Sequence, residues 1–193
     1  MRIHHIIPAI ALSLGFAMAP TTGHAADTYT VDPVHTAALF KIKHVGVSYT
    51  YGRFNDVSGT VTLDAANPAA SKVEIAIQAG SVDTHSEKRD AHLASPDFFD
   101  AKQYATLGFV STTFKKVDDA TYEVAGNFTL HGVTKPLTIT VKKIGEGKDP
   151  WGGYRIGFES TFTIKRSDFG MSKMLEAVGD EVMVTFSTEA IKK

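Results

Sequence analysis

The chain of 193 residues contains no cysteine, and this absence excludes several kinds of chemistry. Disulfides, thiolate metal sites, a cysteine nucleophile and a lipid anchor on an N-terminal cysteine cannot occur. A strong charge imbalance is also lacking, because 20 Lys and Arg face 21 Asp and Glu, for a formal net charge of −1. Without a basic field, the composition gives no reason to expect a nucleic-acid partner.

Long apolar runs are absent except near the N-terminus, where Ile6–Ala19 reads IIPAIALSLGFAMA. This run is shorter than the ~20 residues of a membrane-spanning helix. Small residues stand at Gly23 and Ala25, the positions that signal peptidase prefers to be small. We therefore predict a signal peptide at 1–25, cleaved after Ala25, and a single domain at 26–193. A periplasmic protein that is not integral to the membrane after processing is the expected product.

Apolar and polar residues alternate along most of residues 26–193. In VEIAIQ, for example, Val73, Ile75 and Ile77 alternate with Glu74, Ala76 and Gln78. Such a period of two indicates strands with one apolar face. The same reasoning predicts eight strands, at 35–44, 52–63, 73–79, 105–115, 122–130, 137–141, 156–164 and 182–186, with 29–31 as a candidate short opening strand.

Two stretches interrupt the alternation, at 81–104 and 166–179. Within the first, Ser86–Ala94 is predicted to be a short helix, and Ser95, followed by Pro96 and Asp97, is expected to cap a second helical turn. The other connections are short, so neighbouring strands should pair antiparallel. Sequential hairpins favour a barrel over a sandwich. The predicted fold is all-β: an eight-stranded antiparallel β-barrel with a short helical insert.

An eight-stranded barrel is either filled by its own side chains or holds one small ligand. Aromatic residues such as Phe40, Phe128 and Phe186 fall on the predicted inner faces, and Gly59 and Gly126 leave room there. The pattern alone leaves both interpretations open: a filled core, or a cavity lined with apolar side chains.

The polar residues offer little catalytic signal. His35 and His44 are nine positions apart, which in an unbroken strand places them on opposite faces and roughly 30 Å apart. Two ligands at His85 and His92 are too few for a zinc site, and no metal site is predicted. An Asp90–His92 pair would suit a hydrolase or isomerase, although Arg89 and Asp90 more simply tie the helical insert to the barrel through hydrogen bonds and an ion pair. No nucleophile elbow, P-loop or dinucleotide fingerprint is present, so no catalytic residue is predicted.

Four segments together resemble the YceI family, periplasmic polyisoprenoid-binding proteins with a lipocalin-like barrel. The first has the family's Asp-x-x-His opening, its Phe-x-Ile-x-His strand and its Gly-x-Phe…Gly hairpin. The others are similar to its Arg-Asp-x-His-Leu-x-Ser-x-x-Phe-Phe segment, its Gly-Val-Thr-Lys-Pro hairpin and its Ile-x-Arg-x-Asp-Phe-Gly segment. In this sequence they read VDPVHTAALFKIKHVGVSYTYGRFNDVSGTVTLD, SVDTHSEKRDAHLASPDFFDAKQYATLGFVST, GNFTLHGVTKPLTITV and DPWGGYRIGFESTFTIKRSDFGM.

The resemblance implies a lipocalin-like barrel with a cavity for a long apolar ligand, a polyisoprenoid or a similar lipid such as a quinone, held for carriage, storage or sequestration. It implies no enzyme activity and no cofactor apart from the bound lipid, and it allows a homodimer. Taken with the inward faces, it predicts ligand contacts by Phe40, Ile42, His44, Val61, Leu63, Ile75, Ile77, Leu107, Phe109, Phe128, Phe158, Phe162, Val184 and Phe186. The alternatives are the Asp90/His92 enzyme and a structural or stress-response protein with a filled barrel.

Overall fold

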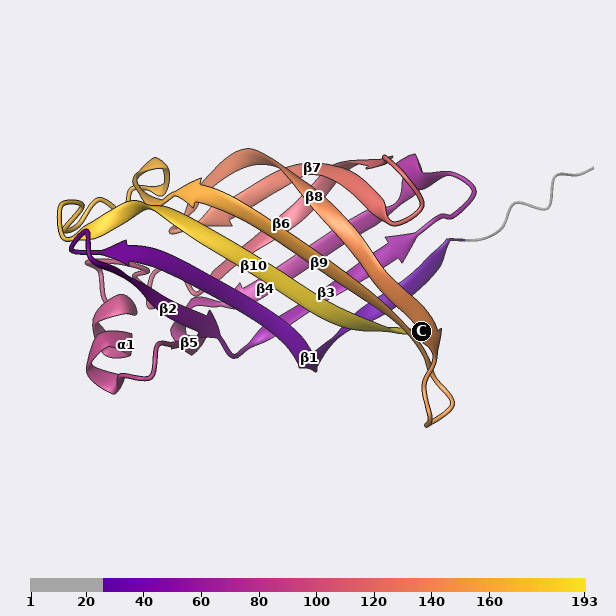
Figure 1. The fold of residues 1–193 in the computed structure, drawn as a ribbon, viewed down its shortest axis with the longest axis horizontal. Helices are drawn as coiled ribbons and strands as arrows, with labels where there is room; N and C mark the ends of the chain where they lie inside the picture. The colour runs from indigo at the N-terminus through magenta and orange to yellow at the C-terminus, as the bar shows by residue number, and fades with distance from the viewer. Residues whose placement is uncertain (1–25) are drawn as a thin grey trace, which may run out of the picture.

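The computed structural model describes residues 26–193. The predicted signal peptide at 1–25 lies outside the described residues. Figure 1 shows an elongated molecule built almost wholly of strands. The strands are β1 (Asp27–His44), β2 (Ser48–Phe54), β3 (Val57–Leu63), β4 (Lys72–Gln78), β5 (Val82–Asp83), β6 (Thr106–Lys116), β7 (Thr121–Leu130), β8 (Val133–Lys148), β9 (Tyr154–Lys165) and β10 (Val178–Lys192). The helices are α1 (Glu87–Leu93) and three 3₁₀ turns, η1 (Pro68–Ala70), η2 (Ala79–Ser81) and η3 (Arg166–Phe169).

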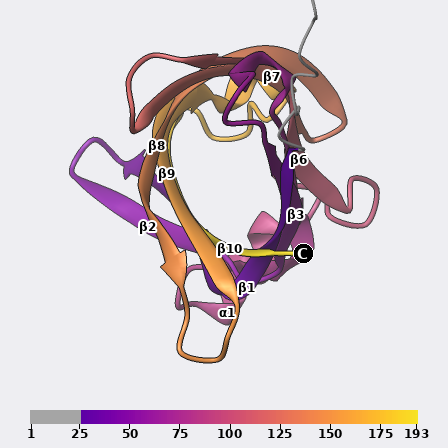
Figure 2. The ribbon, with the colours of Figure 1, turned by 90° about the vertical axis from the view of Figure 1, so that its right-hand side faces the viewer.

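The predicted eight-stranded antiparallel barrel is confirmed. Strands β6 to β10 form a meander, β4 joins β6 to β3, and β3 pairs with the first half of β1. The ring closes because β1 also pairs with β10, which makes every strand of the barrel antiparallel to both neighbours. Seen end-on in Figure 2, these strands form a closed ring. Closure removes the free sheet edges that an open sheet would expose.

Strand β1 changes its partner halfway along. Asp27–Thr30 pair with β3, whereas Ala38–His44 pair with β2, and the register with β10 shifts between Val31 and Thr36. The predicted strands 29–31 and 35–44 are thus two halves of one bent strand. The prediction of one strand at 52–63 is wrong, because residues 55–56 interrupt it and separate β2 from β3. There the backbone N–H of Asn55 donates to Ser81 O at 3.1 Å instead of to a strand.

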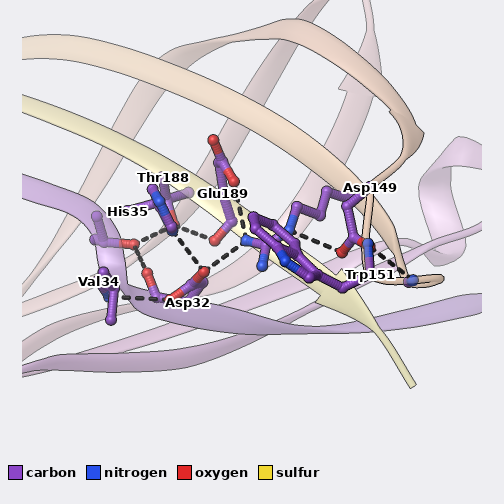
Figure 3. Close-up of polar contacts among 10 residues, drawn as sticks. Asp32, Val34, His35, Asp149, Trp151, Thr188 and Glu189 are labelled. Atoms are coloured by element: carbon purple, nitrogen blue, oxygen red, sulfur yellow. Dashed lines mark hydrogen bonds and ion pairs between the residues drawn. The ribbon is translucent and has the colours of Figure 1, made fainter.

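A polar cluster holds the bend of β1 against β9 and β10 (Figure 3). The buried Asp32 carboxylate accepts hydrogen bonds from the Val34 N–H at 3.0 Å and from the Arg155 guanidinium, and its Oδ2 lies 2.8 Å from His35 Nδ1. Arg155 also donates to Asp149 and to Glu189, each at 3.0 Å. Because Arg155 is on β9 and Glu189 on β10, this cluster ties the bend to both neighbouring strands.

The helical insert closes one side of the barrel wall. Strand β5 pairs only with β2 among the described residues, so no ladder continues from β5 to β6. The predicted helix at Ser86–Ala94 is confirmed as α1. The second turn predicted from Ser95 is a series of hydrogen-bonded turns rather than a helix. These turns place Phe99 edge-on against Phe54 of β2, with ring centroids 5.3 Å apart.

The Asp32 cluster predicts an acid-dependent component of stability. The hydrogen bond from Arg155, followed by that from His35, lowers the pKa of Asp32 to about 2. In the unfolded chain an Asp carboxylate has a pKa near 3.9. The contribution of the Asp32 carboxylate to the free energy of unfolding is therefore fully present above about pH 4 and is lost as the pH falls through 2. Replacing Asp32 with Asn should lower the free energy of unfolding at pH 7 by about 1–2 kcal/mol.

Urea unfolding at several pH values checks this prediction. The Asp32→Asn protein should lose less stability than the parent between pH 4 and pH 2. Asp119→Asn is the matched control, because Asp119 is fully exposed and its Lys116 partner is also at the surface. An Asp32→Asn protein with the parent's stability and the parent's acid dependence would contradict the role assigned to the cluster.

Candidate ligand-binding cavity

The barrel contains an apolar cavity of about 190 Å³, lined by residues of every barrel strand and of the insert. Its wall is apolar apart from Glu159, Ser160, Arg166 and Thr188. Two of these turn their polar atoms to other groups: the Ser160 hydroxyl donates to Thr140 O at 2.7 Å, and the Thr188 hydroxyl lies 2.7 Å from that of Thr36. The cavity is therefore suited to an apolar guest and offers few hydrogen bonds to a polar one.

The structure brings twelve of the fourteen residues predicted to contact a ligand to this wall. They come from seven of the eight barrel strands, and on each of these the alternation predicts the face that lines the cavity. These residues are Phe40, Ile42, Val61, Ile75, Ile77, Leu107, Phe109, Phe128, Phe158, Phe162, Val184 and Phe186.

The other two predicted residues do not line the cavity. His44 was expected on the cavity side of β1, but it is exposed at the end of the strand. The register with β10 shifts between Ile42 and His44, so the inward parity of Phe40 and Ile42 does not continue to His44. Leu63 is the last residue of β3 and lines a separate pocket at the other end of the barrel, beside Asp64 and Tyr122.

The empty part of the cavity lies against one side of the barrel. Inward residues on β4 and β6, such as Ile75 and Phe109, are buried by their neighbours. In contrast, Phe40 on β1, Phe162 on β9 and Val184 on β10 point inward yet remain half-buried. Their partial exposure indicates unfilled space beside the second half of β1, at Phe162 of β9 and at Val184 of β10.

Several wall residues were missed by sequence reasoning because they are not on alternating strands. Leu93, Phe98 and Phe99 of the insert face the cavity, as does Met171 in the loop after η3. The adjacent pair Phe98–Phe99 in a segment without strand character was the available signal. Two consecutive aromatic residues are unusual in an exposed loop and indicate that the loop is packed against a core.

Comparison with known proteins agrees with this architecture. A family model described as YceI-like domain matches residues 29–190. The chain belongs to the YceI family. A UPF0312 protein of Ectopseudomonas mendocina (strain ymp) is 45% identical over 185 residues, covering 95% of this chain and 96% of that protein.

Two solved structures share the fold. The Campylobacter jejuni YCEI protein is 32% identical with a TM-score of 0.71, covering 78% of this chain and 90% of that one. A polyisoprenoid binding domain from Saccharophagus degradans, described as implicated in plant cell wall breakdown, superposes with a TM-score of 0.67 at 17% identity. It covers 86% of this chain and 98% of its own. The same barrel fold thus occurs at low sequence identity.

Arg166 is the one cationic residue among those lining this YceI cavity, and it is 2% exposed. Its guanidinium donates to three backbone carbonyls, those of Gly179 at 2.9 Å, Met171 at 2.6 Å and Val178 at 2.7 Å. Burial lowers the pKa of Arg166. Because these contacts span the loop between η3 and β10, Arg166 fixes the chain that covers this end of the cavity.

The Asp90–His92 pair considered for catalysis is not assembled. Asp90 Oδ1 accepts hydrogen bonds from the N–H of Thr84 at 2.9 Å and from its hydroxyl at 2.5 Å, while His92 Nε2 lies 3.0 Å from Asp97. Arg89 donates to Thr84 as well. Arg89 and Asp90 thus form hydrogen bonds within the insert, to the residue after β5, and not to a strand of the barrel ring as predicted. The expected ion pair is not among those formed by the described residues.

One cluster outside the cavity has the composition of a metal site. Ligand atoms of Asp32, His35 and Glu189 lie within 4.8 Å of one another. However, Arg155 Nη1 already donates to both carboxylates. A cation would have to displace that guanidinium, so this cluster is better understood as the polar fastening of the β1 bend.

Arg166 provides a stability test. Replacing it with Leu should lower the free energy of unfolding by about 3 kcal/mol or more, because three carbonyls near the cavity end lose their donors. Denaturant unfolding measures the change, and Lys165→Leu is the matched control, since Lys165 is the adjacent residue on the exposed face of β9. Equal stabilities for the two variants would show that the guanidinium does not hold the loop.

Proposed function

We propose that this YceI-family chain is a lipid-binding protein that holds a polyisoprenoid, or a similarly long apolar molecule such as a quinone, inside the barrel. The observation that carries the proposal is the continuous apolar cavity. Burying an alkyl chain yields about 0.8 kcal/mol for each CH₂ group, so a dozen buried groups contribute about 10 kcal/mol before the cost of ordering the ligand. Tight binding then needs no specific hydrogen bond.

The shape of the cavity supports a long ligand rather than a compact one. On β10 the lining residues extend from Val178 to Thr188, ten positions apart. Ten strand residues cover about 33 Å, and a strand tilt near 40° reduces this to about 25 Å along the barrel axis. The polyisoprenoid binding domain of Saccharophagus degradans, with the same fold, is consistent with this ligand class.

A binding role fits the chain better than the alternatives. The Asp90/His92 hydrolase or isomerase finds no support in the geometry, because each side chain is bonded to another partner. A filled barrel is disfavoured by the apolar cavity of about 190 Å³ in its interior. Together with the predicted signal peptide, the cavity supports an exported carrier, store or sequestering protein of the periplasm.

Among residues 26–193 no helix is long and apolar enough to cross a membrane. The homodimer allowed by the family stays a prediction.

The ligand itself provides the first test. The protein is purified from its native source or a bacterial host without detergent, extracted with organic solvent and analysed by mass spectrometry. We expect a long isoprenoid or quinone in near-stoichiometric amount. Failure to recover any lipid, together with no uptake of an added long-chain polyprenol or ubiquinone by the extracted and refolded protein, would refute the proposed function.

A substitution into the empty space tests the location of the ligand. Val184→Trp places a large ring in the unfilled part of the cavity and should reduce bound polyprenol at least severalfold, because the ring occupies the ligand's volume. Met183→Trp is the matched control: it is the preceding residue of β10, 39% exposed on the outer face. Equal ligand content in the two variants, with both folded by circular dichroism, would place the ligand elsewhere.

A further inference from the structure

Large apolar side chains are exposed at the end of the barrel where the β1–β2 turn lies. They belong to the turn, to the start of β2 and to the loop before β10. We call this set the apolar tip. It consists of Val45, Val47, Tyr49, Met174 and Leu175, with exposed fractions of 53%, 84%, 55%, 47% and 38%.

The two segments of the apolar tip are joined, so they form one surface. The N–H of Val45 donates to Ala177 O at 2.7 Å, and His44 pairs with Val178 at the start of β10. In Figure 1 the β1–β2 turn and the loop before β10 lie together at the left, at the same end as α1. The cavity reaches this end, because Ile42 and Val178 both line it.

The turn itself is unfavourable for folding as it stands. The N–H of Val47 donates to His44 O at 3.0 Å, and Val45 and Gly46 have φ of 43° and 72°. Two successive positive φ values define a hairpin turn that favours Asn, Asp or Gly at the first position. A β-branched residue there is strained. Val45 is thus unfavourable both in its conformation and in its exposure to water, and folding stability gives no reason for it.

The hairpin of the apolar tip carries basic residues and no acidic one. The hairpin segment 41–51, KIKHVGVSYTY, contains two lysines and no acidic residue. Lys41 and Lys43 pair with Tyr51 and Tyr49 across the hairpin, and Lys41 Nζ lies 5.0 Å from the centre of the Tyr49 ring. The loop before β10 contains one lysine and one acidic residue, Lys173 and Glu176, and Lys173 Nζ lies 3.5 Å from Asp97 Oδ1 of the insert.

The opposite end also exposes apolar residues, Ile144 at 67% and Trp151 at 77%. However, its three loops, at 64–71, 117–120 and 144–153, contain five acidic residues and one lysine. Three of those acidic residues pair with basic residues of the adjoining strands: Asp119 with Lys116, Glu146 with Lys143 and Asp149 with Arg155. The hairpin of the apolar tip, in contrast, places basic, aromatic and aliphatic side chains together without an acidic residue, and an anionic surface would attract it. This combination is typical of segments that lie at the interface of an anionic membrane.

We propose that the apolar tip docks this protein on the surface of an anionic phospholipid bilayer. Val45 and Val47 enter the boundary between headgroups and acyl chains, Tyr49 lies at headgroup level, and Lys41 and Lys43 face the phosphates. Docking in this orientation turns the Ile42–Val178 end of the cavity toward the bilayer. The inference rests on the proposed function for its purpose, since a lipid carrier must meet the membrane that supplies or receives its cargo.

The test measures binding to vesicles that contain no isoprenoid. The purified protein is sedimented with vesicles of phosphatidylcholine alone and of phosphatidylcholine mixed with phosphatidylglycerol. We expect binding to the mixed vesicles that weakens with added salt. Val45→Asn combined with Val47→Thr should reduce binding about tenfold, because two apolar side chains no longer enter the interface. Asn suits the positive φ of the turn, so this variant keeps the hairpin.

The matched control is Val117→Asn combined with Ile144→Thr at the opposite end, where the side chains are 58% and 67% exposed. Its binding should equal that of the parent. Replacing Lys41 and Lys43 with Gln should remove the preference for phosphatidylglycerol. Absence of binding by the parent protein, or an equal loss in the control, would overturn the proposal.

Two further measurements separate the competing explanations. If sedimentation velocity shows that Val45→Asn/Val47→Thr splits a dimer while the parent does not bind vesicles, the apolar tip is an interface between two copies and the proposal is wrong. Lipid extracted from the same variant should match that of the parent, because the cavity wall is unchanged. Retained lipid with lost vesicle binding supports docking. A parent protein that yields no lipid and takes up no added polyprenol would refute the proposed function, and its binding to vesicles would still decide whether the apolar tip docks.

Discussion

The pairing of β1 with β10 is the constraint on which the rest of this structure depends. β1 is also the only strand of the barrel that exchanges one partner for another, β3 for β2, while it remains paired with β10. The exchange requires a bend, and the bend leaves backbone groups without ladder partners. The Asp32 carboxylate and the Thr36 hydroxyl satisfy or fix these groups, and Arg155 couples them to β9 and β10. The closure of the ring therefore depends on the polar cluster that stabilises the bend of β1.

The divergence of β2 from β3 at this bend determines where the barrel needs a cover. Strand β3 continues the ring through β4, whereas β2 leads to the short β5 and then to the insert. The insert supplies aromatic residues instead of another strand, and Phe99 packs on Phe54 at the point where the ladder stops. At the same end, Arg166 fixes the loop before β10 through three carbonyls. Packing and hydrogen bonding thus replace strand pairing around this end of the cavity.

The sequence predicts the inner face of the barrel well because side-chain alternation is a local property of each strand. Phe128, Phe158 and Phe162 were placed correctly from a period of two alone. The prediction failed at His44, where the register with β10 shifts, and at 52–63, where the strand is interrupted. Both features depend on which strands pair with one another. That information is not local, because the strand is interrupted where the backbone N–H of Asn55 donates to Ser81, 26 residues later. The contribution of Phe98, Phe99 and Arg166 escaped notice for the same reason, since only the closed barrel brings those segments to the cavity.

The alternation of apolar and polar residues could not predict whether the barrel is filled or hollow, because both states require the same apolar inner face. The half-buried inward side chains resolve the question physically. Phe40, Phe162 and Val184 lack neighbours on one side, and each forfeits the dispersion contacts that a filled core would supply. An apolar guest that fills this space completes the core, so its binding is thermodynamically coupled to folding. At a thousandfold excess over its dissociation constant, such a guest adds about 4 kcal/mol to stability. Loaded and empty molecules of identical sequence would then differ in melting temperature and in resistance to proteases, which makes the lipid supply of the cell a determinant of how long each molecule survives.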